Sequence, residues 1–195
     1  MVPFVGLTGG VGSGKSTALA ALERLGAAVL STDAVVHELY RSQELRDAVC
    51  ARWGPEMVRD GEVDRSAVAA RAFASAEDRK WLEGELWPRV GMRVAEWREA
   101  VAAADPAPPA GVVEVPLLFE SGMDGAFDAT LAVISDEAVR RERAGARGHA
   151  AVDERVARQL PQDEKARRAT YVVENDGSVD DLERKLSDVL AKLRG

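Results

Sequence analysis

The stretch GGVGSGKS, residues 9–16, decides how this chain folds. It matches the pattern G-x-x-x-x-G-K-[ST] in full. The glycines let the backbone wrap closely around a phosphate group, and a helix that begins near Lys15 directs the positive end of its dipole at the same anion. Residues 2–7 are an apolar run that reads as a buried strand. The sequence therefore predicts a strand, a phosphate-binding loop and a helix in succession, and this context argues against a coincidental glycine-rich turn.

Short apolar runs along the rest of the chain predict an α/β fold. Residues 27–30, 112–117, 130–134 and 171–173 read as strands, with helical patterns between them. Strands that alternate with helices imply a parallel sheet with helices on both faces, which makes three layers.

An insertion of helical character interrupts this alternation. Helical spacing without a confident strand runs from about residue 33 to 104, and the proline-rich residues 105–111 form a stiff linker that closes it. Ser75 followed by Asp78 predicts a capped helix start. Pro88 lies inside the helix that follows, so we expect a kink or a break there.

Composition limits the classes of protein and of partner. The chain has 195 residues, a formal net charge of −7 and one cysteine, Cys50. The acidic balance speaks against a general nucleic-acid binder, and the lone cysteine excludes an internal disulfide. No run has the length of a membrane span, and no targeting segment is visible. We expect a cytoplasmic monomer with neither a membrane nor a nucleic-acid partner.

A phosphate-binding loop is shared by small-molecule kinases, GTPase switches and mechanical ATPases. The chain has no N-K-x-D segment for guanine and no L-S-G-G-Q-like signature of transporter ATPases. A small-molecule kinase needs an acceptor-binding insertion and an arginine-bearing lid, and the chain has candidates for both. The sequence favours an ATP-dependent kinase over a regulator that uses ATP occupancy as a switch.

The expected ATP contacts centre on the loop. Lys15 is predicted to reach the β- and γ-phosphates, and the Ser16 hydroxyl to bind Mg²⁺. The loop residues expected to bind ATP are Gly10, Val11, Gly12, Ser13, Gly14, Lys15, Ser16 and Thr17.

The lid candidate is the basic run of residues 140–147. Arg140, Arg143 and Arg147 fall on one helical face, and their guanidinium groups suit phosphoryl oxygens. A solvated, salt-bridged helix is the alternative.

Three further side chains are candidates for the chemistry. Asp33 follows the second strand at the carboxyl edge of the sheet, where it can accept the proton of an acceptor hydroxyl or serve only as a helix N-cap. Glu114, inside an apolar strand, is a candidate Mg²⁺ ligand, although any buried carboxylate needs some partner. His37 on the following helix either touches the acceptor or lies on the helix surface.

These residues together resemble the dephospho-coenzyme A kinase family over essentially the whole chain. The resemblance rests on residues 7–17, on the PLLFE segment at 116–120, on Gln159 to Lys165, and on ENDG at 174–177. Asp33 stands where the family places its catalytic aspartate.

The resemblance implies that ATP phosphorylates the 3′-hydroxyl of the dephospho-CoA ribose, the last step of coenzyme A synthesis. It implies a five-stranded parallel core formed by residues 1–34, 107–139 and 169–195. Residues 35–106 would be a helical acceptor-binding insertion, and residues 140–168 a helical lid.

It also implies individual roles. Lys15, Asp33 and Arg143 would be catalytic, Asn175 would lie near the adenine, and the acceptor would contact Asp33, His37, Pro116 and Leu117. A related nucleoside or nucleotide kinase with another acceptor is the rival enzyme.

Two departures concern the acceptor. The family's D-A-D after the second strand is Ser31-Thr32-Asp33 here, and its L-H-P segment contains Trp87 in place of the histidine. Both leave the phosphate-binding loop, Asp33 and the lid arginines unchanged.

Overall fold

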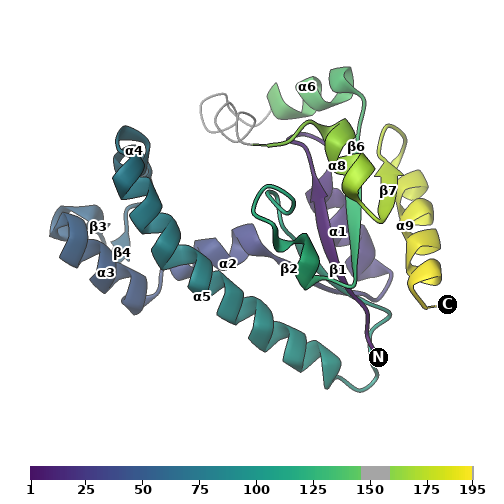
Figure 1. Cartoon of the computed structure of the whole chain (residues 1–195), viewed down its shortest axis with the longest axis horizontal. Coiled ribbons are helices and arrows are strands. Elements are labelled where there is room, and N and C mark those ends of the chain that lie inside the picture. The colour runs from purple at the N-terminus through teal and green to yellow at the C-terminus, as the bar shows by residue number, and fades with distance from the viewer. Residues whose placement is uncertain (146–158, 195) are drawn as a thin grey trace. The chain divides into compact units, whose positions relative to one another are not determined.

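The computed structural model describes residues 1–145 and 159–194, which belong to two compact units. The first unit is formed by Met1–Ser31 and Arg98–Gly195, and the second by Thr32–Trp97. The long helix α5, Ala76–Ala102, runs from the second unit into the first (Figure 1).

The first unit is built on a five-stranded sheet in the order β2-β5-β1-β6-β7, and all its strand pairs are parallel. The strands are β1 Phe4–Gly9, β2 Ala28–Ser31, β5 Gly111–Glu114, β6 Ala129–Ile134 and β7 Tyr171–Glu174. This arrangement confirms the predicted α/β fold, and each predicted strand is present within a few residues of its expected bounds.

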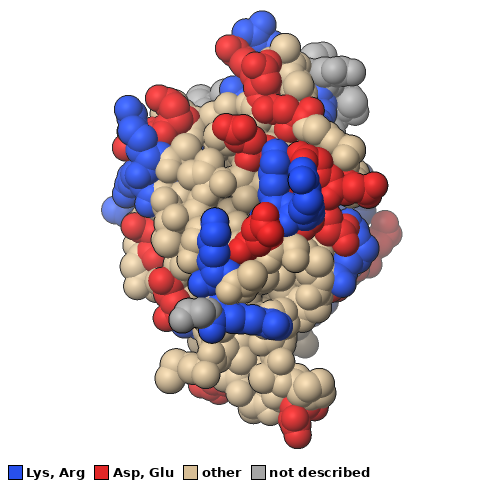
Figure 2. All heavy atoms as spheres, turned by 90° about the vertical axis from the view of Figure 1, so that its right-hand side faces the viewer, with Lys and Arg blue, Asp and Glu red and all other residues tan. Residues whose placement is uncertain are grey.

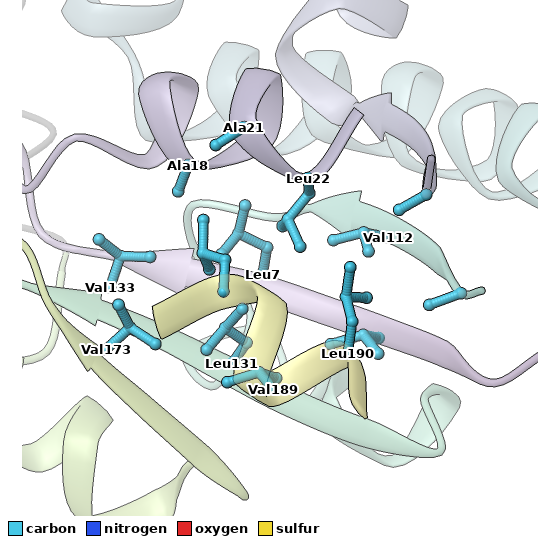
Figure 3. Close-up of a cluster of buried hydrophobic side chains, with 14 of the residues drawn as sticks. Leu7, Ala18, Ala21, Leu22, Val112, Leu131, Val133, Val173, Val189 and Leu190 are labelled. Carbon is cyan, nitrogen blue, oxygen red and sulfur yellow. The ribbon is translucent and has the colours of Figure 1, made fainter. Parts of the chain in front are cut away.

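One face of the sheet carries the main core of this unit (Figure 3). Leu7 of β1 and Leu131 of β6 pack against Leu22 of α1, Lys15–Arg24, and against Leu190 of α9, Val179–Arg194. The apolar positions of α9 recur every three or four residues, so a single stripe of the helix is buried.

The other face is covered by α8, Gln162–Arg168. Successive side chains of a strand point to opposite faces, so Thr8 lies on the face opposite that of Leu7. The Lys165 ammonium group of α8 meets the Thr8 hydroxyl there at 3.2 Å. Helices therefore cover both faces, as predicted. The described part of this unit also contains α6, Glu137–Gly145, and the short 3₁₀ helix η2, Met123–Ala126.

The second unit is mostly helical. Its elements, besides most of α5, are α2 Thr32–Leu39, α3 Gln43–Trp53, η1 Pro55–Met57, β3 Val58–Arg59, β4 Glu62–Val63 and α4 Arg65–Ala74. Trp53 and Trp81 pack edge to face with ring centroids 4.7 Å apart, and the Trp53 indole donates a hydrogen bond to Asp78. The Ser75 hydroxyl accepts a hydrogen bond from the Asp78 amide at 3.2 Å, which confirms the predicted helix start.

One expectation for this region was wrong, and one of the two alternatives at Pro88, a break in the helix, is excluded. Strands β3 and β4 form a two-stranded antiparallel sheet that no sequence pattern indicated, because two residues per strand carry no readable periodicity. Pro88 lies inside α5 and does not divide it into two helices. Leu86 and Val90 beside it are buried, and this packing holds the helix together where the proline removes a backbone hydrogen bond.

The face of the first unit that carries α9 shows acidic and basic side chains interspersed (Figure 2). Ion pairs on this helix include Glu183 with Arg24 at 2.8 Å and Asp181 with Lys185 at 2.9 Å. The electrostatic field over this face is therefore of mixed sign. Within the described ranges, no helix is long and apolar enough to cross a membrane.

Candidate active site

The candidate site lies at the carboxyl edge of the sheet in the first unit. From β1 the chain runs outward to β2, returns to β5 beside β1, and then continues with β6 and β7 on the other side. Parallel sheets bind ligands at the carboxyl edge where the strand order reverses in this way. The predicted motifs follow the strand ends: residues 10–16 follow β1, residues 115–120 follow β5, and Asn175 follows β7.

The glycine-rich stretch forms a tight loop that leads into α1. The Ser13 amide donates to the Gly10 carbonyl at 3.2 Å, and Lys15 Nζ donates to the same carbonyl at 3.1 Å. Gly14 caps the helix with φ of +89°, in the left-handed region that favours glycine. Ser16 and Thr17 are exposed in the first turn of α1, where a helix attracts anions.

Asn175, the residue after β7, makes a hydrogen bond to this loop. It is buried, and its side-chain Nδ2 donates to the Ser13 carbonyl at 2.9 Å. Its own carbonyl accepts hydrogen bonds from the Ser135 hydroxyl at 2.8 Å and from Arg143 Nη1 at 3.0 Å. The predicted ATP residue Asn175 therefore contacts the loop itself. Ser135 is a site residue that the sequence reasoning missed, although its position directly after β6 could have drawn attention to it.

A substitution at Gly14 tests whether the packing of the loop against Asn175 affects ATP binding. A Cβ at position 14 would lie 2.1 Å from Asn175 Nδ2, and the backbone is left-handed there. Gly14→Ala is expected to distort the loop at a cost of about 1–3 kcal/mol and to weaken ATP binding roughly 5- to 150-fold, measured by titration calorimetry. Gly91→Ala on α5 is the control, because a Cβ there meets no atom within 4 Å. A folded Gly14→Ala variant with wild-type ATP affinity would contradict the prediction.

Two of the predicted lid arginines lie at the loop. The Arg140 carbonyl approaches Gly12 so closely that a Cβ there would lie 2.5 Å from it, and Arg140 Nη1 would lie 3.0 Å from a Cβ at Gly10. Arg140 Nε is buried without a hydrogen-bond partner among the described residues. Arg143 also donates to the Ser135 hydroxyl at 3.2 Å. Arg147 lies outside the described residues.

A pocket opens beside the loop. Gly10 and Val11 line one part of it, and Arg140, Gln159 and Gln162 line another. The Val11 amide donates to Gln159 Oε1 at 3.2 Å, so Gln159 is already in contact with the loop. The sequence reasoning assigned no role to Gln159, because nothing in the local pattern shows that the residues after the lid return to the loop.

The segment after β5 contributes backbone groups. The Pro116 carbonyl accepts from Lys165 Nζ at 2.7 Å, and the Leu117 carbonyl accepts from the Ser121 hydroxyl at 2.7 Å. Both residues are half-buried. Their predicted contact with the acceptor stays a prediction.

Glu114 ends β5 and is buried, with only 6% of its surface exposed. It is in register with Leu7 of β1 and with Ser31 of β2, so its side chain lies on the face of the sheet that α1 covers. Among the described residues, no group of three or more His, Cys, Asp or Glu side chains could hold a metal ion.

The second unit carries two of the predicted acceptor residues, Asp33 and His37. Asp33 is exposed in the first turn of α2, which begins at Thr32, so Asp33 is not its N-cap. His37 lies one turn further along the same face. Arg65 Nη1 contacts His37 Nδ1 at 2.5 Å, and because a guanidinium can only donate, Arg65 is the donor of this contact. The Arg65 guanidinium also lies over the Tyr40 ring at 5.6 Å.

Comparison with known proteins supplies the family. The dephospho-CoA kinase family model matches residues 3–181. A dephospho-CoA kinase of Thermus thermophilus is 40% identical over 195 residues, covering 98% of this chain and 92% of its own. That of Anaeromyxobacter dehalogenans is 41% identical over 196 residues, with the same shares covered.

A solved structure agrees with these sequence matches. The crystal structure of TT1252 from Thermus thermophilus has a TM-score of 0.80 and 39% identity, and covers 100% of this chain and 99% of its own. With a family model that spans most of the chain and relatives of this similarity over nearly their whole length, the chain belongs to the dephospho-CoA kinase family.

Proposed function

We propose that this chain transfers the γ-phosphoryl group of ATP to the 3′-hydroxyl of the ribose of dephospho-CoA, which gives coenzyme A and ADP. The observation that carries the proposal is the match of the family model to residues 3–181, which includes every strand end of the candidate site.

The loop is proposed to hold the ATP phosphates. The amides of residues 10–16 and the Lys15 ammonium group offer donors and positive charge, and the dipole of α1 adds to them. Lys15 donates to the Gly10 carbonyl of the same loop, so its ammonium group lies at the loop that is proposed to hold the phosphates.

The family's ATP is used with Mg²⁺, and the residues present suit that ion. Mg²⁺ prefers oxygen ligands, keeps several waters, and binds with few protein groups plus the substrate phosphates. We propose Ser16, at the start of α1, as its protein ligand. Glu114, buried on the α1 face of the sheet, is the second candidate. When bound, the ion neutralises charge on the phosphates.

Asp33 is proposed to orient the acceptor hydroxyl and to accept its proton as the oxygen attacks the γ-phosphorus. The bond to the leaving ADP oxygen breaks as the new ester bond forms, so no phosphoenzyme is needed. His37, whose Nδ1 contacts Arg65, is proposed to contact the acceptor through its other ring nitrogen. The second unit, Thr32–Trp97, would then bind most of the acceptor.

The lid arginines are proposed to stabilise the transferring group. Arg143 and Arg140 lie next to the loop and carry planar guanidinium groups that match phosphoryl oxygens. Arg143 donates to the Asn175 carbonyl, a contact that helps to hold its guanidinium group beside the loop, and preorganised donors of this kind stabilise a transition state. Arg147 is proposed for the same role from the sequence alone.

The experiment is to measure ADP release from ATP and Mg²⁺ with dephospho-CoA, AMP, adenosine or no acceptor. We expect turnover only with dephospho-CoA. Preference for AMP or adenosine would assign the chain to another acceptor, and ATP binding without transfer to any of them would assign it to a regulator.

A further inference from the structure

A buried lysine lies beneath the nucleotide site. Lys165 of α8 has no exposed surface, yet its ammonium group reaches three oxygens. These are the Pro116 carbonyl at 2.7 Å, Glu120 Oε1 at 2.9 Å and the Thr8 hydroxyl at 3.2 Å. An ammonium has three protons to donate, so this set satisfies it. Burial lowers the pKa of Lys165, while the ion pair with Glu120 acts in the opposite direction.

A contribution to the stability of the fold is by itself a weak explanation for a buried lysine. The desolvation of a buried ion pair offsets most of its attraction, and well-packed apolar side chains often serve as well. Its position suggests another reason. Thr8 lies at the end of β1, directly before the glycine-rich loop, and Pro116 comes two residues after β5. Lys165 therefore joins the carboxyl ends of the two neighbouring strands between which the strand order reverses.

The partners of Lys165 also hold the segment that returns from the lid. Gln159 Nε2 donates to the Pro116 carbonyl at 3.4 Å, and the Leu160 amide donates to Glu120 Oε1 at 2.8 Å. The Oε1 atom of the same Gln159 side-chain amide accepts a hydrogen bond from the Val11 amide of the loop. A continuous path of hydrogen bonds thus runs from Lys165 through Pro116 and Gln159 to the loop.

We propose that Lys165 is a positioning residue of the ATP site. By fixing the Pro116 carbonyl and the Glu120 carboxylate, it holds Gln159 against Val11 and so sets the shape of the loop that receives a nucleoside triphosphate. This inference deepens the proposed function and rests on it for the identity of the nucleotide.

A double-mutant cycle on ATP affinity tests the path. Lys165→Met and Gln159→Leu are each expected to raise the Kd for ATP by about tenfold, the size of one lost hydrogen bond. If Lys165 acts through Gln159, the Kd of the double variant for ATP is no higher than that of the single variant with the higher Kd. A roughly hundredfold, additive loss would overturn the proposal, as would wild-type affinity in Lys165→Met.

A second pair of variants separates positioning from stability. Lys165→Met leaves the Glu120 charge buried without its partner, so its melting temperature is expected to fall. Adding Glu120→Gln removes that charge and keeps an acceptor for the Leu160 amide. We expect the melting temperature to recover while ATP binding stays weak. If the melting temperature and the ATP affinity both recover, Lys165 has only a structural role, and the proposal is overturned.

Lys185→Met is the matched control. Lys185 also donates to a backbone carbonyl, that of Glu174, but at the surface of α9. Its ATP affinity is expected to equal that of the wild type. Because the Kd is measured without an acceptor, a wild-type protein that fails to phosphorylate dephospho-CoA would refute the proposed reaction and leave this test intact.

Discussion

Lys15→Ala is expected to lower kcat by about a thousandfold or more, the loss typical of removing a preorganised charge from a phosphoryl-transfer site. Lys15 follows Gly14 at the start of α1, and the structure gives its ammonium group a bond to the Gly10 carbonyl at 3.1 Å. No neighbouring lysine of the loop can replace it, since residues 9–16 contain no other cation. The measurement is single-turnover ADP formation with saturating ATP and acceptor.

The control for this experiment is Lys192→Ala. Lys192 is exposed on α9, far along the chain from the loop, so wild-type turnover is expected from its alanine variant. A folded Lys15→Ala variant whose kcat stays within about tenfold of the wild type, the limit set by ordinary hydrogen bonds, would remove Lys15 from the proposed machinery.

Asp33→Asn is expected to lower kcat by about 10²- to 10⁴-fold, the range of general-base catalysis. The asparagine keeps the shape of the side chain and loses its ability to accept a proton. Asp33 lies on α2 of the second unit, whereas the loop belongs to the first. Because Asp33 is proposed to act on the acceptor hydroxyl and not to hold ATP, we expect the Kd for ATP to stay that of the wild type.

Asp47→Asn supplies the matched control, because Asp47 is an exposed aspartate on α3 of the same unit. We expect its kcat and its Kd for ATP to be unchanged. A loss of ATP affinity in Asp33→Asn, or a kcat close to that of the control, would contradict the proposed role of Asp33.

The strand, loop and helix at the N-terminus could be predicted because their signals are local. An apolar run, a fixed spacing of glycines and a helical pattern each act over a few residues, and the structure has β1 and α1 where the sequence expects them. The family resemblance was equally readable, since its motifs are short contiguous stretches. The family model and the relatives confirm it.

The network beneath the loop could not be predicted in the same way. Lys165 lies in a short, highly charged helix, where most lysines point to solvent. Its burial depends on the packing of α8 on the face of the sheet opposite α1. This tertiary contact has no signal in the sequence of the helix itself. Asn175 is similar, because the direction of its amide toward Ser13 depends on how β7 aligns with the loop. Pro88 is the converse case. Its local signal favours a break in the helix, yet α5 continues through it.

The most direct test of the proposed reaction is the position of the new phosphate. Purified protein would be incubated with ATP, Mg²⁺ and dephospho-CoA, and the product examined by phosphorus–proton correlation NMR. The proposal predicts one new phosphomonoester coupled to the ribose H3′, formed together with one ADP per product. A phosphate on another oxygen of the acceptor, or ADP released without any phosphorylated acceptor, would contradict it.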